Sequence, residues 1–185
     1  MLENGYMFLK YVLSQGWGEL ATGNDSRNEP QSNALLRTTL RYPLYSKGDL
    51  DGAIAEYRTA IRLHPDFAAA HYNLGIALAK KGDLDGAIAE YRTAIRLKPD
   101  DAGDHYNLGN ALHDKGDLDG AIAEFRTAIH LQPHYATAHA LLGLALGLKG
   151  DRRAALEELR TAYLLDPKNP KIAQAYERLL REVNQ

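Results

Sequence analysis

The chain has 185 residues, of which 22 are Lys or Arg and 24 are Asp or Glu, so its formal charge is −2. This near-neutral balance does not favour nucleic-acid binding driven by neutralisation of phosphates. The chain has no cysteine, which excludes disulfides, thiol catalysis and cysteine-ligated zinc.

Neither a membrane span nor an export signal is evident. The longest mostly apolar stretch, residues 136–148, is too short to cross a bilayer and contains His139. The apolar run at residues 6–13 follows Glu3 and is interrupted by Lys10, which makes it a poor secretory signal. A cytoplasmic location is therefore the default expectation.

A repeat of 34 residues organises most of the chain. The segment 47–63 recurs unchanged at 81–97 and returns with two substitutions at 115–131. Proline and glycine recur with the same period, at Pro65, Pro99, Pro133 and Pro167 and at Gly48, Gly82, Gly116 and Gly150. A period of this length is typical of repeat architectures. Four units follow, at residues 34–67, 68–101, 102–135 and 136–169.

Residues 1–33, before the first unit, form a poorly determined N-terminal extension. Residues 2–13 favour a helix, and residues 22–33 are polar and turn-rich, as in a loop or linker. A degenerate fifth repeat is one alternative, and an unrelated extension is the other. The aromatic residues of this extension are suited either to docking on the array or to self-association.

Each unit predicts two helices. In the second unit, residues 68–81 are rich in Ala and Leu, Gly82 ends the pattern, and Asp83 is suited to cap the next helix. Residues 86–97 then place apolar side chains on one stripe, and Pro99 ends this helix. No segment alternates with a period of two, so we expect an all-α protein without a sheet.

Three glycines lie inside the first helices of their units, at Gly75, Gly109 and Gly143. A glycine inside a helix costs about 1 kcal/mol relative to alanine. Its recurrence at one phase therefore indicates close approach of a neighbouring helix. A helix pair cannot bury both of its apolar sides alone, so stability should depend on stacking between neighbours.

These positions resemble the tetratricopeptide repeat (TPR). The second unit matches the pattern at His71, Leu74, Gly75, Leu78, Ala87, Tyr91, Ala94 and Pro99. The third and fourth units match at the equivalent positions, with His in place of the usual Trp. The first unit matches only in its second half, and Pro43 predicts a short or kinked first helix at 34–46.

The resemblance implies a right-handed α-solenoid of stacked helix-turn-helix units, closed by a C-terminal capping helix at residues 170–185. It also implies a concave face, lined by the first helix of each unit, that binds a peptide or helix of another protein. Carried over by phase, the peptide-binding residues are Asn73, Asn107, Tyr72, Tyr106, Asn110, Ile76, Lys80, His113 and Asp114. The implied function is a non-catalytic scaffold for protein–protein interaction.

Asn73 and Asn107 share one phase in adjacent repeats, and an amide both donates and accepts hydrogen bonds. The pair resembles the asparagine ladder in the repeat array of O-linked N-acetylglucosamine transferase, which implies a clamp on a peptide backbone. The alternative is that each amide satisfies a nearby backbone group or faces water. Tyr72 and Tyr106 likewise offer either flat contact area or packing between repeats.

Other charged and titratable rows have simpler interpretations. A carboxylate clamp of the chaperone-binding type needs several inner cations, and Lys80 is the main one here. We expect Arg58, Arg92, Arg126 and Arg160 on a solvated face, balanced by Glu56, Glu90, Glu124 and Glu158. We expect His71, His105 and His139 to be core residues, because neighbouring repeats are too far apart for one metal to bind all three.

No motif for nucleophilic, phosphate-binding or zinc-dependent catalysis occurs, so we expect neither an enzyme nor a cofactor. Two further functions stay open. One is an accessory or substrate-recognition domain of an enzyme complex, such as a glycosyltransferase. The other is a self-assembling array, formed through residues 1–33 or by end-to-end stacking.

Overall fold

The computed structural model describes residues 50–183, and within this range it contains eight α-helices and no strand. The helices are α4 (Leu50–Leu63), α5 (Ala68–Lys81), α6 (Leu84–Leu97), α7 (Ala102–Lys115), α8 (Leu118–Leu131), α9 (Ala136–Leu148), α10 (Arg152–Leu165) and α11 (Pro170–Val183). The extension at 1–33 and the first helix expected at 34–46 lie outside the described residues. No helix in the described range is both long enough and apolar enough to span a membrane.

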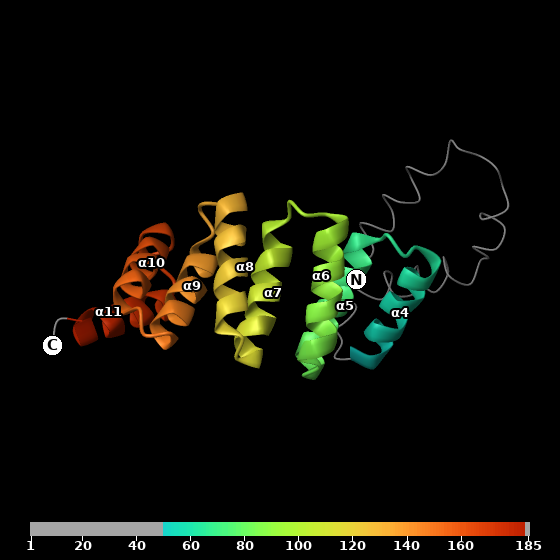
Figure 1. Cartoon of the computed structure of the whole chain (residues 1–185), viewed down its shortest axis with the longest axis horizontal. Helices are drawn as coiled ribbons and strands as arrows, with labels where there is room; N and C mark the ends of the chain where they lie inside the picture. The colour runs from blue at the N-terminus through green and yellow to red at the C-terminus, as the bar shows by residue number, and fades with distance from the viewer. Residues whose placement is uncertain (1–49, 184–185) are drawn as a thin grey trace, which may run out of the picture.

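The helices form antiparallel pairs that stack side by side along the long axis of the molecule (Figure 1). Helix α5 packs on α6, α7 on α8 and α9 on α10, and the second helix of each pair also contacts the first helix of the next pair. Helix α11 packs on α10 at the end of the row. The chain is a right-handed α-solenoid, which confirms the fold predicted from the repeat.

The turn within each pair follows from two adjacent residues. Gly82 ends α5 with φ of 88°, a left-handed conformation that side chains other than glycine rarely adopt. The Asp83 carboxylate then accepts a hydrogen bond from the Gly86 backbone N–H at 2.9 Å. This bond caps α6, which begins at Leu84, two residues before the predicted start. The predicted helix end and cap are confirmed.

The glycine inside each first helix makes room for an aromatic or aliphatic side chain of its partner helix. A Cβ added at Gly75 would lie 2.7 Å from Cε1 of Tyr91, closer than real contacts allow. The same relationship joins Gly109 to Phe125. The predicted close approach is therefore confirmed, and the approaching helix is the second helix of the same pair.

Within the described residues, the core consists of two buried apolar clusters, one extending from α4 to α10 and one joining α9, α10 and α11. Its largest fully enclosed side chains are Tyr57, Phe125, Leu108 and Leu159. A fully buried large apolar side chain contributes about 1.5–3 kcal/mol. Ile172 of α11 is buried against Ala140, Leu159 and Ala162, and Tyr176 of the same helix stacks on Tyr163 with ring centroids 5.5 Å apart. Helix α11 thus covers the last pair.

Candidate functional site

The first helices of successive pairs meet one another along one side of the solenoid. Helix α5 contacts α7, and α7 contacts α9. The Asn107 side chain on α7 donates a hydrogen bond to the Tyr72 hydroxyl oxygen on α5 at 2.9 Å. We call this side of α5, α7 and α9 the inner face. The repeat phase predicts that this face carries Asn73, Asn107, Tyr72, Tyr106, Asn110, Ile76, Lys80, His113 and Asp114.

The two asparagines of the predicted clamp are largely enclosed. Asn73 is buried. Asn107 is half-buried, and besides its bond to Tyr72 its Nδ2 donates to the carbonyl oxygen of Gly103 at 3.0 Å. The side-chain amino group of Asn107 thus bonds both to the preceding repeat and to the backbone of its own helix. A clamp on a peptide backbone by this pair stays a prediction.

The two tyrosine rings pack against aromatic rings of their own repeats and keep part of their surface exposed. The Tyr72 ring is tilted against Tyr91 with ring centroids 6.1 Å apart. The Tyr106 ring is tilted against Phe125 and stacks on Tyr135 with centroids 4.9 Å apart. Tyr135 immediately precedes α9 and was not among the predicted site residues. Burial, together with Tyr106 and Asp101, raises the pKa of Tyr135 above its ordinary value.

The remaining predicted residues differ in how far they are exposed. Ile76 is half-buried and packs against the core, and Asn110 is half-buried. Lys80 and Asp114 are exposed. His113 is half-buried, with its Nδ1 3.4 Å from Oδ1 of Asp114. Its Nε2 is fully enclosed and has no hydrogen-bond partner within residues 50–183.

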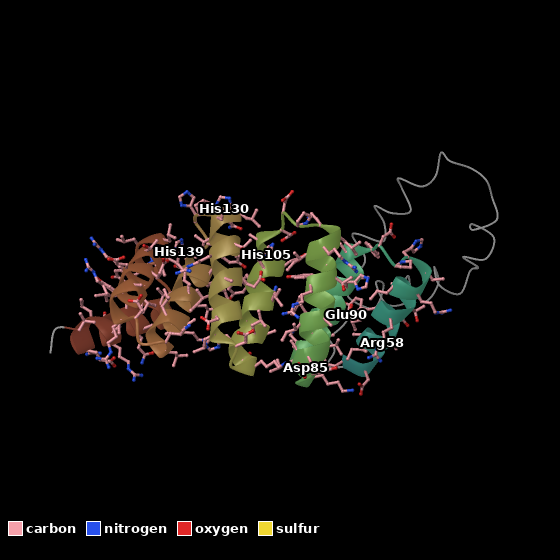
Figure 2. The ribbon with its side chains drawn as sticks, viewed as in Figure 1. Arg58, Asp85, Glu90, His105, His130 and His139 are labelled. Atoms are coloured by element: carbon pink, nitrogen blue, oxygen red, sulfur yellow. The ribbon has the colours of Figure 1, made fainter. Side chains whose placement is uncertain are left out.

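The three histidines are buried, as predicted, and each makes two polar contacts. Nδ1 of His71 lies 2.6 Å from Oε2 of Glu90, and Nε2 lies 3.0 Å from the carbonyl oxygen of Pro65. His105 and His139 repeat both contacts. In Figure 2, His105 and His139 lie in the upper part of the view, whereas Asp85 lies at its lower edge. Within the described residues, no cluster of His, Asp or Glu is arranged to hold a metal ion.

These contacts correct the expectation for the glutamate row. Glu90, Glu124 and Glu158 are half-buried and hydrogen-bond the histidines, so they are not simply solvated partners of the arginines. The reason is helix pairing, which brings a position of the second helix opposite the histidine of the first. The arginines at 58, 92, 126 and 160 are exposed, as predicted.

The sequence analysis missed Asp104, a carboxyl group that is only 6 % exposed. Burial, with a smaller contribution from Asp101, raises its pKa from 3.8 to about 7, against the opposing effects of Lys98 and His105. The equivalent positions in the neighbouring repeats are Ala70 and Ala138, both fully buried. Alignment of the repeats could have identified Asp104, because its carboxyl group replaces alanine at a packing position.

Shallow notches of about 440 and 430 Å³ lie between successive repeats, where a second helix meets the turn of the next pair. Each notch contains an exposed ion pair between repeats, Lys81 with Asp51 in the first and Lys115 with Asp85 in the second. Cations and carboxylates are balanced there, so the notches favour no particular charge of ligand.

Comparisons with known families agree with this architecture. Two models described as "Tetratricopeptide repeat" match residues 44–102 and 136–169, and a model described as "TPR repeat" matches residues 109–150. No curated protein sequence matches the chain.

Solved structures show the same fold. A crystal structure of MamA is 26% identical to the chain, with a TM-score of 0.72 over 75% of this chain and 81% of that one. The TPR domain of Arabidopsis OM64 has a TM-score of 0.59 and 22% identity over 60% of this chain and 93% of that one. The first TPR of Spaghetti (RPAP3), bound to the HSP90 peptide SRMEEVD, has a TM-score of 0.61 and 19% identity over 64% of this chain and 96% of that one.

Three repeat models match the chain, its helices pack in pairs, and glycines allow the helices of a pair to approach closely. The chain therefore belongs to the tetratricopeptide repeat family.

Proposed function

We propose that this chain is a non-catalytic interaction scaffold whose inner face binds a peptide or helix of another protein. The observation that carries the proposal is the mixed surface of α5, α7 and α9. Tyr72 on α5 and Tyr106 on α7 keep part of their surface exposed, and the Tyr72 hydroxyl accepts a hydrogen bond from the Asn107 amide. By repeat phase, α7 adds the amide of Asn110, the imidazole of His113 and the carboxylate of Asp114 to the same face. Aromatic side chains beside groups that donate and accept hydrogen bonds are suited to protein recognition.

Two further observations support a binding role. The family and the solved structures with this fold include an RPAP3 repeat domain bound to a peptide. In this chain, the aromatic rings are held by contacts with Tyr91, Phe125 and Tyr135, so their orientation is fixed before a partner arrives. Fixed orientation lowers the entropy cost of binding.

The test uses peptides selected from a displayed library against the purified chain. Asn110→Arg adds a long charged side chain at a half-exposed position of the inner face. Ala123→Arg adds the same side chain at an exposed position of α8, the second helix of the same repeat. Fluorescence anisotropy should show at least about tenfold weaker binding for Asn110→Arg, equivalent to about 1.4 kcal/mol.

Ala123→Arg should bind the selected peptides as tightly as the unmodified chain. Equal weakening by both variants, or by neither, would contradict binding at the inner face. Thermal unfolding of both variants, followed by circular dichroism, shows whether a loss of binding reflects a loss of fold.

A further inference from the structure

Helix α9 carries a stripe of leucines on the inner face that α7 lacks. Leu144 is 42% exposed and Leu148 is 67% exposed, while Leu141 is partly buried against the core. The equivalent positions of α7, one repeat earlier, are all polar: Asn107, Asn110 and Asp114. Large apolar side chains left in water forgo the stabilisation of burial, and an apolar patch rimmed by polar groups is typical of an interaction site.

The leucine stripe follows α9, and the helices on either side of it carry polar side chains at the equivalent positions. On the α7 side, the Asp114 side chain is 66% exposed. On the α11 side, the positions equivalent to Leu144 and Leu148 are Arg178 and Glu182, which pair with each other at 3.0 Å. A partner segment that ran across the repeats would therefore meet mostly polar groups, whereas one that lay along α9 would meet leucines.

The spacing of the leucines favours a helical partner. Leu141, Leu144 and Leu148 are three and four residues apart, so they lie on one side of α9. At a rise of 1.5 Å per residue they span about 10 Å, roughly two turns. An amphipathic helix offers apolar side chains at the same intervals and polar groups on both flanks. The negative charge of Asp114 favours a basic flank on the side of the partner that faces α7.

We propose that Leu141, Leu144 and Leu148 form a docking seam for an amphipathic helix of a partner protein, with Lys or Arg on its flank toward Asp114. This inference rests on the proposed function, because it uses the same inner face. It specifies which repeat anchors the partner, that the bound segment is helical, and that its flank carries positive charge.

The repeats supply the test variants themselves. The double variant Leu144→Asn, Leu148→Asp places in α9 the side chains that α7 carries at the same positions, so the fold already tolerates them. The matched control is Leu164→His on α10. Leu164 is 69% exposed, and His130 occupies its equivalent position on α8.

The probe is a synthetic helical peptide of about 18 residues with leucines at the intervals of the seam and lysines on one flank. A peptide of the same composition in scrambled order removes the apolar stripe. By fluorescence anisotropy, the full chain should bind the ordered peptide at least about tenfold more tightly than the scrambled one. The double variant should lose this preference, and Leu164→His should keep it. Asp114→Lys should instead favour a version with glutamates on the flank.

Equal affinity of the unmodified chain and the double variant for the ordered peptide would overturn the proposal. It would also be overturned if sedimentation velocity showed a dimer that the double variant converts to monomer, because the seam would then be covered by a second copy. Failure of the seam is distinguishable from failure of the proposed function. If Asn110→Arg weakens binding of library-selected peptides while the leucine variant does not, the inner face binds by other residues.

Discussion

His71 and Glu90 face each other across the helix pair of the second repeat, with Nδ1 of the ring 2.6 Å from Oε2 of the carboxylate. The other ring nitrogen lies 3.0 Å from the carbonyl oxygen of Pro65 in the preceding repeat. Both ring nitrogens thus face oxygen atoms, and the histidine joins its own helix pair to the repeat before it.

Breaking this contact should weaken the array. Glu124→Ala leaves Nδ1 of the buried His105 without its partner, and an unsatisfied buried polar group costs about 1–3 kcal/mol. Urea unfolding should therefore show a fall of this size in the free energy of unfolding. Glu157→Ala, at an exposed position one residue before Glu158, should change stability by no more than about 0.5 kcal/mol.

A double-mutant cycle tests whether the pair acts as a unit. If His105 and Glu124 stabilise each other, the double alanine variant should lose less stability than the sum of the two single variants, with a coupling of about 0.5–3 kcal/mol. Strict additivity would mean that the two groups contribute independently.

Asp104→Ala should stabilise the protein at neutral and higher pH. Because the folded-state pKa of Asp104 is raised from 3.8 to about 7, the folded chain holds the proton more tightly than the unfolded chain. The contribution of this group is thus most favourable below pH 3.8 and is lost as the pH rises to about 7. Above pH 7, this difference in pKa between the folded and unfolded states lowers the free energy of unfolding by at most roughly 4 kcal/mol relative to its value at low pH.

The measurement is urea unfolding of both proteins at several pH values. The stability of Asp104→Ala relative to the original chain should increase from pH 4 to pH 8. Asp100→Ala, which removes an exposed carboxylate from the turn just before α7, should not show this increase. A stability difference for Asp104→Ala that does not vary with pH would contradict a buried, protonated carboxyl group.

Two glycines one turn apart in α9 should respond to alanine with opposite signs. A Cβ at Gly143 would lie 2.9 Å from the Ala155 carbonyl oxygen, a backbone atom that no side-chain rotation can move away. Gly143→Ala should therefore lower stability by about 1–3 kcal/mol. At Gly147 the nearest atom is Cβ of Ala155 at 3.6 Å, an ordinary contact. Gly147→Ala should gain up to about 1 kcal/mol from helix propensity, and thermal unfolding of the two variants compares them directly.

The lysine–aspartate pairs between repeats should contribute little despite their regular recurrence. Lys115 pairs with Asp85, with side chains 51% and 79% exposed, and water screens such charges. Lys115→Met should lower the free energy of unfolding by less than about 1 kcal/mol. The effect should shrink further in 1 M salt, where the screening length is about 3 Å. A larger loss that persists in salt would show that the pair holds the repeats together.

Much of the fold could be predicted because its determinants are local and recur every 34 residues. Gly82 and Asp83 define a helix end and a cap through the backbone preferences of single residues. Gly75 signals a close helix contact because glycine is otherwise costly inside a helix. These features depend on neighbours along the chain, so the sequence alone was sufficient for the order of the helices and their paired packing.

The tertiary structure decided which polar groups meet and which apolar groups stay exposed. The pairing of His71 with Glu90 and of Asn107 with Tyr72 depends on the separation and rotation of packed helices. The repeat period places side chains at the same phase, but it does not set these distances. The burial of Asp104 and the exposure of Leu148 have the same origin, because neighbouring helices determine how much water each side chain keeps.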